Sequence, residues 1–189
     1  SITPKWGGTK ELMTDFIEES KQSSMNARNK GNLEERYLNL MADNALLEKD
    51  YLNASIYFNK SYMLNNLPQT LESSAQAAQS GGFLDLAFAR FNQLVIAHPK
   101  YLFGYQQRGY LYETHIKDIE NAIMDYLTAA DLGGDWAQNR LGWYYMMGVN
   151  VPVDYVKAKH YLDLAAVQGN ATAKANLDVL KELLVQPGK

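Results

Sequence analysis

The residues able to act in catalysis are few and widely spaced. The 189-residue chain has three histidines, His98, His115 and His160, and no cysteine. None of the histidines has a second one three or four positions away, the spacing that gives two metal ligands on one helix face. We therefore interpret His98 and His115 as residues near helix ends, where a histidine suits the helix dipole. His160 is interpreted as an exposed or groove residue.

Adjacent carboxylates occur at Glu18 and Glu19 and again at Glu34 and Glu35. Neighbouring residues on a helix point about 100° apart, so these pairs do not face one another as an acid and a base. Ser73 and Ser74 lack the glycines of a nucleophile elbow, and no glycine-rich phosphate loop is present. We predict no catalytic residues, no metal site and no cofactor, and hence a protein that is not an enzyme.

Composition and charge exclude two classes of partner. The chain has 18 basic and 21 acidic residues, a net charge of −3, and 47% hydrophobic residues, which is ordinary for a folded soluble protein. No segment carries the basic stripe that nucleic acid binding needs. The longest apolar run, Leu141–Val149, falls well short of the ~18 residues of a membrane span. We expect neither nucleic acid binding nor membrane insertion.

The first residues bear on the compartment. They contain neither an initiating methionine nor the apolar core of a signal peptide. We expect a mature or trimmed chain located in the cytoplasm, and the lack of cysteine leaves a periplasmic location open.

Small residues recur along the chain with a nearly constant period. The separations are 33, 35 and 36 residues between Ala54, Ala87, Ala122 and Ala158. Four positions after each stands a bulky apolar residue, namely Phe58, Phe91, Tyr126 and Leu162. A period of this length that holds two helical segments predicts an α-solenoid, in which small residues let helices approach and stacked hairpins share one core.

Local signals predict an all-α chain of about ten helices. Asp50, Asp85, Asp118 and Asp154 lie near the expected starts of second helices, and paired glycines follow several helical patterns. The expected helices are 9–26, 34–48, 50–65, 69–80, 83–97, 102–115, 118–132, 135–147, 154–168 and 171–184. They divide the chain into an N-terminal segment and capping helix (1–33) and a repeat solenoid (34–189). The solenoid has units at 34–66, 68–99, 102–132 and 135–168 and a C-terminal helix at 171–184.

The last complete unit carries the most specific pattern. It consists of Ala137, Leu141, Gly142, Tyr145, Gly148, Val151, Asp154, Ala158, Ala165, Ala166, Gly169, Ala173 and Leu177. This pattern resembles a Sel-one-like repeat, the variant of the tetratricopeptide repeat with a longer loop, here 149–153. His98 and Pro99, with Ala87 and Phe91, resemble the closing half of a tetratricopeptide repeat. The segment 4–8 is similar to a short motif beside such repeats in a bacterial family, which implies a bacterial source.

The resemblance implies a right-handed α-solenoid that binds a peptide or protein in its concave groove. In tetratricopeptide repeats the first helix of each hairpin lines that groove. The matching positions are Arg36, Asn39, Asp43, Gln69, Glu72, Gln76, Phe103, Gln106, Tyr110, Glu113, Trp136, Asn139, Trp143 and Met146, with Thr172 and Val179 in the last incomplete unit. The first two units offer polar side chains, whereas the third and fourth offer aromatic ones. We expect an apolar end near Tyr110, Trp136 and Trp143, unless the tryptophans pack against the final helices.

The predicted function is therefore a non-enzymatic adaptor or scaffold for another protein. A narrower form is a bacterial immunity or inhibitor protein that masks a toxin, because the acidic stretches 31–67 and 101–134 suit a basic target such as a nuclease. One alternative is a scaffold or regulatory part of a larger enzyme whose catalytic residues lie outside this chain. Another is a purely structural spacer.

Overall fold

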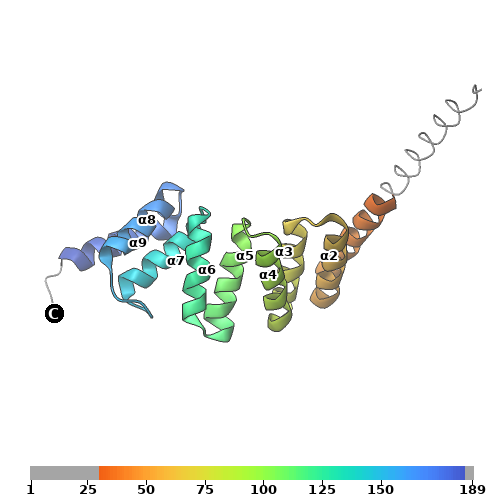
Figure 1. Cartoon of the computed structure of the whole chain (residues 1–189), viewed down its shortest axis with the longest axis horizontal. Coiled ribbons are helices and arrows are strands. Elements are labelled where there is room, and N and C mark those ends of the chain that lie inside the picture. The colour runs from red at the N-terminus through yellow and green to blue at the C-terminus, as the bar shows by residue number, and fades with distance from the viewer. Residues whose placement is uncertain (1–29, 186–189) are drawn as a thin grey trace, which may run out of the picture.

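A computed structural model of the chain describes residues 30–185, which fold into an elongated row of helices (Figure 1). Residues 30–47 are helical. The helices that follow are α2 (Tyr51–Asn65), α3 (Pro68–Ser80), α4 (Leu84–Ala97), α5 (Leu102–Leu111), the π-helical turn η1 (Tyr112–Ile116), α6 (Ile119–Asp131), α7 (Asp135–Met147), α8 (Tyr155–Val167) and α9 (Ala171–Val185). No strand occurs between residues 30 and 185. The predicted helix over 9–26 and nearly all of the segment 1–33 lie outside the described residues.

The second helix of three hairpins begins at an aspartate. The carboxylates of Asp50, Asp118 and Asp154 accept hydrogen bonds from backbone N–H groups three residues later, at 3.2, 3.1 and 2.9 Å. Each bond satisfies a donor that the first helical turn leaves unpaired. These caps start α2, α6 and α8, as the sequence predicts.

The repeating small residues lie where helices approach most closely. Ala54, Ala87, Ala122 and Ala158 are all fully buried. At Gly142, on α7, a methyl group would lie 2.5 Å from the side chain of Leu162 on α8. The helix backbones are therefore too close at this point for any side chain larger than hydrogen.

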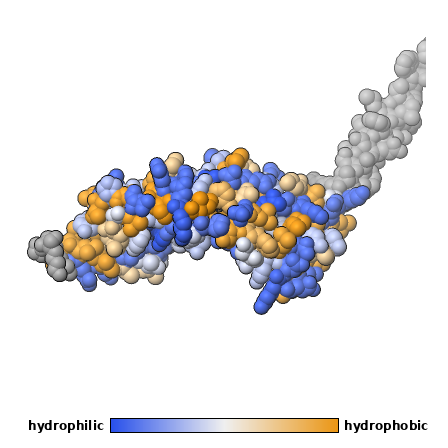
Figure 2. Space-filling view, turned by 90° about the horizontal axis from the view of Figure 1, so that it is seen from below, coloured by the Kyte–Doolittle hydropathy of each residue, from blue (hydrophilic) through white to orange (hydrophobic). Residues whose placement is uncertain are grey.

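The core runs along the row as a series of clusters rather than one centre. One cluster joins α2 to α5 around Leu71 and Phe91, the next joins α6 to α7 around Tyr126 and Leu141, and a third joins α7 to α9 around Leu162. On the face shown in Figure 2, hydrophobic side chains are interleaved with hydrophilic ones. Each hairpin thus buries its apolar stripe against its neighbours, which is how an α-solenoid is stabilised.

Two expected helices depart from the prediction. The helix expected over 34–48 is already formed at residue 30 and ends at residue 47. The helix expected over 102–115 ends as α5 at Leu111 and continues as the π-helical turn η1. The backbone N–H of Lys117, which has a left-handed conformation with φ of 65°, donates to the carbonyl of Tyr112 and closes this turn. The wider turn changes the direction of the side chains after Leu111, Glu113 among them.

Candidate partner-binding groove

A surface groove of about 370 Å³ lies between α5 and the first turn of α7. We call it the aromatic groove, and its lining residues are Phe103, Gln106, Gln107, Tyr110, Asp135 and Trp136. The side chains of Phe103, Tyr110 and Trp136 are 45%, 40% and 37% exposed. The rings of Tyr110 and Trp136 meet edge to face, with centroids 6.5 Å apart. The groove therefore presents three accessible rings with polar groups between them.

The spacing along α5 places its four lining residues on one face. The successive spacings of three, one and three positions are those of residues on one stripe of an α-helix, here Phe103, Gln106, Gln107 and Tyr110. The groove is completed by the start of α7, where Asp135 and Trp136 stand in the first turn.

Two glycines fix which face of α5 points outward. A methyl group at Gly104 would lie 3.0 Å from Val95 of α4, and one at Gly109 would lie 2.7 Å from the ring of Tyr126 of α6. Both glycines are buried, so α5 packs with this side against α4 and α6. Phe103, Gln107 and Tyr110 are left at or near the surface as a consequence, whereas Gln106 at the edge of the stripe is only 7% exposed.

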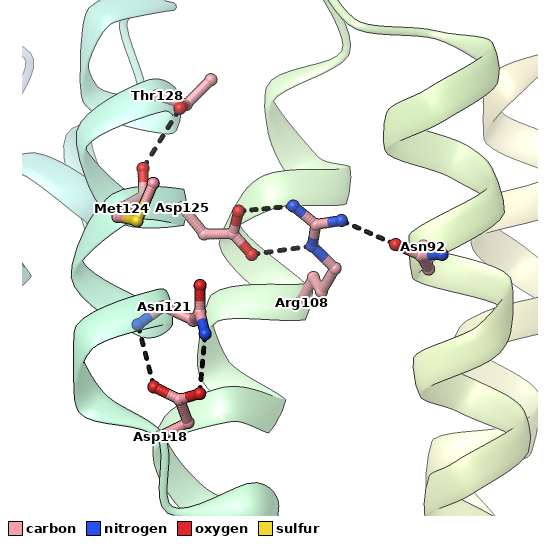
Figure 3. Close-up of polar contacts among 7 residues, drawn as sticks. All are labelled: Asn92, Arg108, Asp118, Asn121, Met124, Asp125 and Thr128. Atoms are coloured by element: carbon pink, nitrogen blue, oxygen red, sulfur yellow. Dashed lines mark hydrogen bonds and ion pairs between the residues drawn. The ribbon is translucent and has the colours of Figure 1, made fainter.

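A polar network joins α4, α5 and α6 behind the groove (Figure 3). The guanidinium of Arg108 donates two hydrogen bonds to the carboxylate of Asp125, at 2.7 and 2.8 Å, and a third to the amide oxygen of Asn92 at 2.8 Å. The hydrogen bonds to Asp125 raise the pKa of Arg108. The guanidinium therefore stays charged and holds α5 between its neighbours.

A second network connects η1 with α6 and α7. The carboxylate of Glu113 accepts a hydrogen bond from the hydroxyl of Tyr126 at 2.7 Å and forms an ion pair with Arg140. Arg140 in turn lies over the ring of Trp143, 5.0 Å from its centroid. Glu113 was predicted to face a partner, but its carboxylate is bound to groups of the chain itself.

The two tryptophans of the fourth unit have different surroundings. Trp136 lines the aromatic groove and packs edge to face on Tyr126, with ring centroids 5.3 Å apart. Trp143 is half-buried and contacts the core clusters on both sides of α7. Trp136 is thus part of the groove, whereas Trp143 belongs mainly to the packing of the last helices.

The structure contradicts the prediction for Met146. Its side chain is only 4% exposed and packs in the cluster formed by α7, α8 and α9. The repeat register places Met146 near the end of a groove-lining helix, but α9 covers this part of α7. Asn139, two turns earlier, is half-buried and accepts a hydrogen bond from Asn176 of α9 at 2.9 Å. Thr172 and Val179, on α9 itself, are exposed.

The predicted residues of the first two units are at or near the surface but do not contribute to the aromatic groove. Arg36, Asp43, Gln69 and Gln76 are exposed, and Asn39 and Glu72 are half-buried. The carboxylate of Glu72 accepts hydrogen bonds from the amide of Gln76, at 2.7 Å, and from the hydroxyl of Tyr101. These predicted residues therefore lie apart from the aromatic groove.

Two groove residues were missed in the sequence analysis. Gln107 and Asp135 line the groove beside predicted residues, each next to one of them in the sequence. The repeat register selects a narrow stripe on each first helix, so it omits side chains at the edge of that stripe. A wider stripe, with residues three and four positions apart taken together, would have included Gln107.

The histidines do not converge. The hydroxyl of Tyr62 lies 3.2 Å from Nε2 of His98, and Nε2 of His115 lies 3.4 Å from Asp85, whereas His160 packs beside Tyr161. Among residues 30–185, no group of three or more histidine, aspartate and glutamate side chains is arranged to hold a metal ion. In the same part of the chain, no helix is both long enough and apolar enough to cross a membrane.

Comparison with known proteins identifies the repeat type. Residues 137–170, which cover most of α7 and α8 and the loop between them, match the family model of the Sel1 repeat. This part of the chain is thus similar to a Sel1 repeat. The row of helices is similar to the crystal structure of a Sel1 repeat protein from Oxalobacter formigenes, with a TM-score of 0.62 and 25% sequence identity over 80% of this chain.

The match to the Oxalobacter protein spans 64% of that protein's length. A search of curated proteins gives no match to the chain. The Sel1 repeat and the structural similarity together support the α-solenoid architecture that the period of small residues predicts. Sel1 repeats are generally protein–protein interaction modules and generally not catalytic.

Proposed function

We propose that this protein is a non-enzymatic interaction module that binds a segment of another protein in the aromatic groove. The observation that carries the proposal is the set of three exposed rings on α5 and α7. Aromatic side chains held at a surface are the typical anchors of protein interfaces, because they bury a large area at a small cost in conformational entropy.

The surroundings of the groove support this role. Arg108 and Glu113 tie α5 and η1 to the neighbouring helices, so the rings stand on a fixed frame. A preformed site loses less conformational entropy on binding than a flexible one. The amide of the half-buried Gln107 lies beside the rings and can hydrogen-bond to the backbone of a bound segment, whereas Gln106, predicted to face a partner, is only 7% exposed.

The proposal is tested with a double substitution, Tyr110→Ala and Trp136→Ala, in an affinity capture from lysate of the native organism. Both side chains are partly exposed, so we expect the variant to fold and to lose the partner that the unaltered chain retains. The matched control is Ile96→Ala with Met124→Ala, which removes exposed apolar side chains from α4 and α6. Binding through the groove would be contradicted if the control variant loses the partner as fully as the groove variant does. It would also be contradicted if both double variants keep the partner.

An inhibitor or immunity role is a narrower form of the same proposal. The acidic stretch 101–134 has five acidic and two basic residues, a net charge of −3. This negative balance favours a basic target such as a nuclease toxin. We expect co-expression with a toxin encoded beside it to protect cells, and the Tyr110→Ala, Trp136→Ala variant to protect them less. Absence of protection against every neighbouring toxin would contradict this role.

A further inference from the structure

The charge of the aromatic groove is carried by one residue. Among its six lining residues, Asp135 alone is ionisable at neutral pH. Oδ2 of Asp135 accepts a hydrogen bond from the amide of Asn170 at 2.9 Å, which fixes the carboxylate and leaves Oδ1 available. The groove thus combines three aromatic rings, the accessible amide of Gln107 and one oriented carboxylate.

The cations of the neighbouring helices do not neutralise this site. Arg108 is bound to Asp125 and Asn92, and its guanidinium lies near the rings of Tyr105 and Tyr112, outside the groove. Arg140 is bound to Glu113 and lies over Trp143. Both positive charges on α5 and α7 are thereby committed to other carboxylates, and Asp135 faces the groove without a cation from these helices.

This combination selects the charge of a ligand. The face of an aromatic ring attracts a cation, and most strongly where water is excluded. A carboxylate repels an anionic side chain, and covering Asp135 with a purely apolar one would bury its charge without a partner. A positively charged side chain satisfies both the rings and Asp135.

The aromatic lining of the groove favours guanidinium over ammonium. A guanidinium is flat, stacks on aromatic rings, and carries five N–H donors and no acceptor. The groove offers aromatic rings for stacking, with the acceptor oxygens of Asp135 and Gln107 beside them. An ammonium is a compact, strongly hydrated charge that gains less from such walls.

We propose that the aromatic groove receives an arginine side chain of the partner protein, packed against the rings of Tyr110 and Trp136, with its guanidinium stacked on one of them and hydrogen-bonded to Asp135. The inference rests on the proposed function and makes it more specific. It predicts that an exposed arginine of the partner is the residue whose loss weakens the complex most.

The test uses the full chain and follows the indole N–H signal of Trp136 by NMR, assigned by its loss in Trp136→Leu. The probe is N-acetylarginine N-methylamide, and the comparison probes are the citrulline, lysine and norleucine analogues and free arginine. Citrulline has nearly the same shape as arginine but no charge. We expect the arginine probe to bind at least about tenfold more tightly than the citrulline and norleucine probes.

Two matched variants test whether the charge of Asp135, rather than a change in the fold, determines binding of the arginine probe. We expect Asp135→Asn, which keeps the shape of the side chain, to weaken the arginine probe about tenfold and the citrulline probe little. The control is Asp131→Asn, which removes an exposed carboxylate on α6 outside the groove. It should change the affinity for neither the arginine probe nor the citrulline probe. Equal binding of arginine and citrulline, a preference for norleucine, or no shift of the Trp136 signal would overturn the inference. If the lysine probe binds as tightly as the arginine probe, the choice of guanidinium over ammonium is wrong. If free arginine binds more tightly than the blocked arginine probe, the ligand is the free amino acid and not an arginine of a partner protein.

The two proposals can fail separately. A partner that is lost by Tyr110→Ala with Trp136→Ala but retained unchanged by Asp135→Asn would overturn the arginine inference and leave the binding groove in place. A partner that all of these variants retain would overturn both.

Discussion

Arg108 shows how a single side chain holds the frame of the groove. It contacts α4 through Asn92 and α6 through Asp125 (Figure 3). The side chains of Arg108 and Asp125 are only 17% and 7% exposed, so each charge depends on the other for compensation. A buried pair of this kind makes the removal of one partner far more costly than the replacement of both.

We predict that Arg108→Ala lowers the free energy of unfolding by about 3–5 kcal/mol, because it leaves the carboxylate of Asp125 buried and unpaired. The double variant Arg108→Met with Asp125→Leu should recover most of that loss. The free energies of unfolding of the single and the double variant are measured by urea unfolding monitored by circular dichroism.

The control for this prediction is an exposed ion pair. Lys181 and Asp178 are 2.8 Å apart with side chains 73% and 72% exposed, so Lys181→Ala should change the free energy of unfolding by less than about 1 kcal/mol. A loss for Arg108→Ala no larger than that of Lys181→Ala would contradict a structural role for the buried pair.

At the scale of helices, close packing at glycine decides which face each helix presents. Gly104 and Gly109 bring α5 against α4 and α6, and Gly142 brings α7 against α8. Since the buried side of each helix is set in this way, the opposite side of α5 carries the groove residues. The orientation of the groove therefore follows from residues that never touch a ligand.

We predict that Gly142→Ala lowers the free energy of unfolding by about 1–3 kcal/mol, because the new methyl group would lie 2.5 Å from Leu162. Gly31 is the matched control, since it is also helical but has no atom within 4 Å of the added methyl position. Gly31→Ala should raise the free energy of unfolding by up to about 1 kcal/mol through helix propensity alone. Thermal unfolding compares the two, and stabilisation by both substitutions would contradict close packing at Gly142.

Most helix bounds between residues 34 and 185 could be predicted from the sequence. Aspartate caps, turn glycines and the period of small residues are local signals, and the observed ends of α2, α3, α4, α6, α7, α8 and α9 lie within one residue of the expected ones. The π-helical turn η1 could not be predicted in this way. No helix-breaking residue stands between Leu111 and Ile116, and Glu113 is bound to Arg140, which is 27 residues away in the sequence.

The candidate site was predictable in part, for the same reason. The repeat register places Phe103, Gln106, Tyr110 and Trp136 on first helices, and the structure brings these four together in one groove. The register fails at Met146, because it treats every hairpin alike and does not account for α9, which covers the end of α7. Residues at the end of a row have different neighbours from equivalent residues in its middle.

At the scale of the whole molecule, the row of hairpins separates stability from binding. The core clusters follow the row from α2 to α9, while the aromatic groove lies at the surface between α5 and α7. Each hairpin is stabilised mainly by its neighbours, so a surface residue of one unit can change without loss of the others. This separation is what an interaction module needs, because its binding surface can be adapted to a partner while the scaffold is kept.

The central claim, that a partner binds over α5 and α7, is tested most directly by site-specific photo-crosslinking. A photoreactive phenylalanine derivative is placed at Tyr110 in one protein and at Met124, on the exposed surface of α6, in another. The account predicts a crosslinked partner from position 110 and none from position 124. A partner crosslinked from position 124 and absent from position 110 would contradict it.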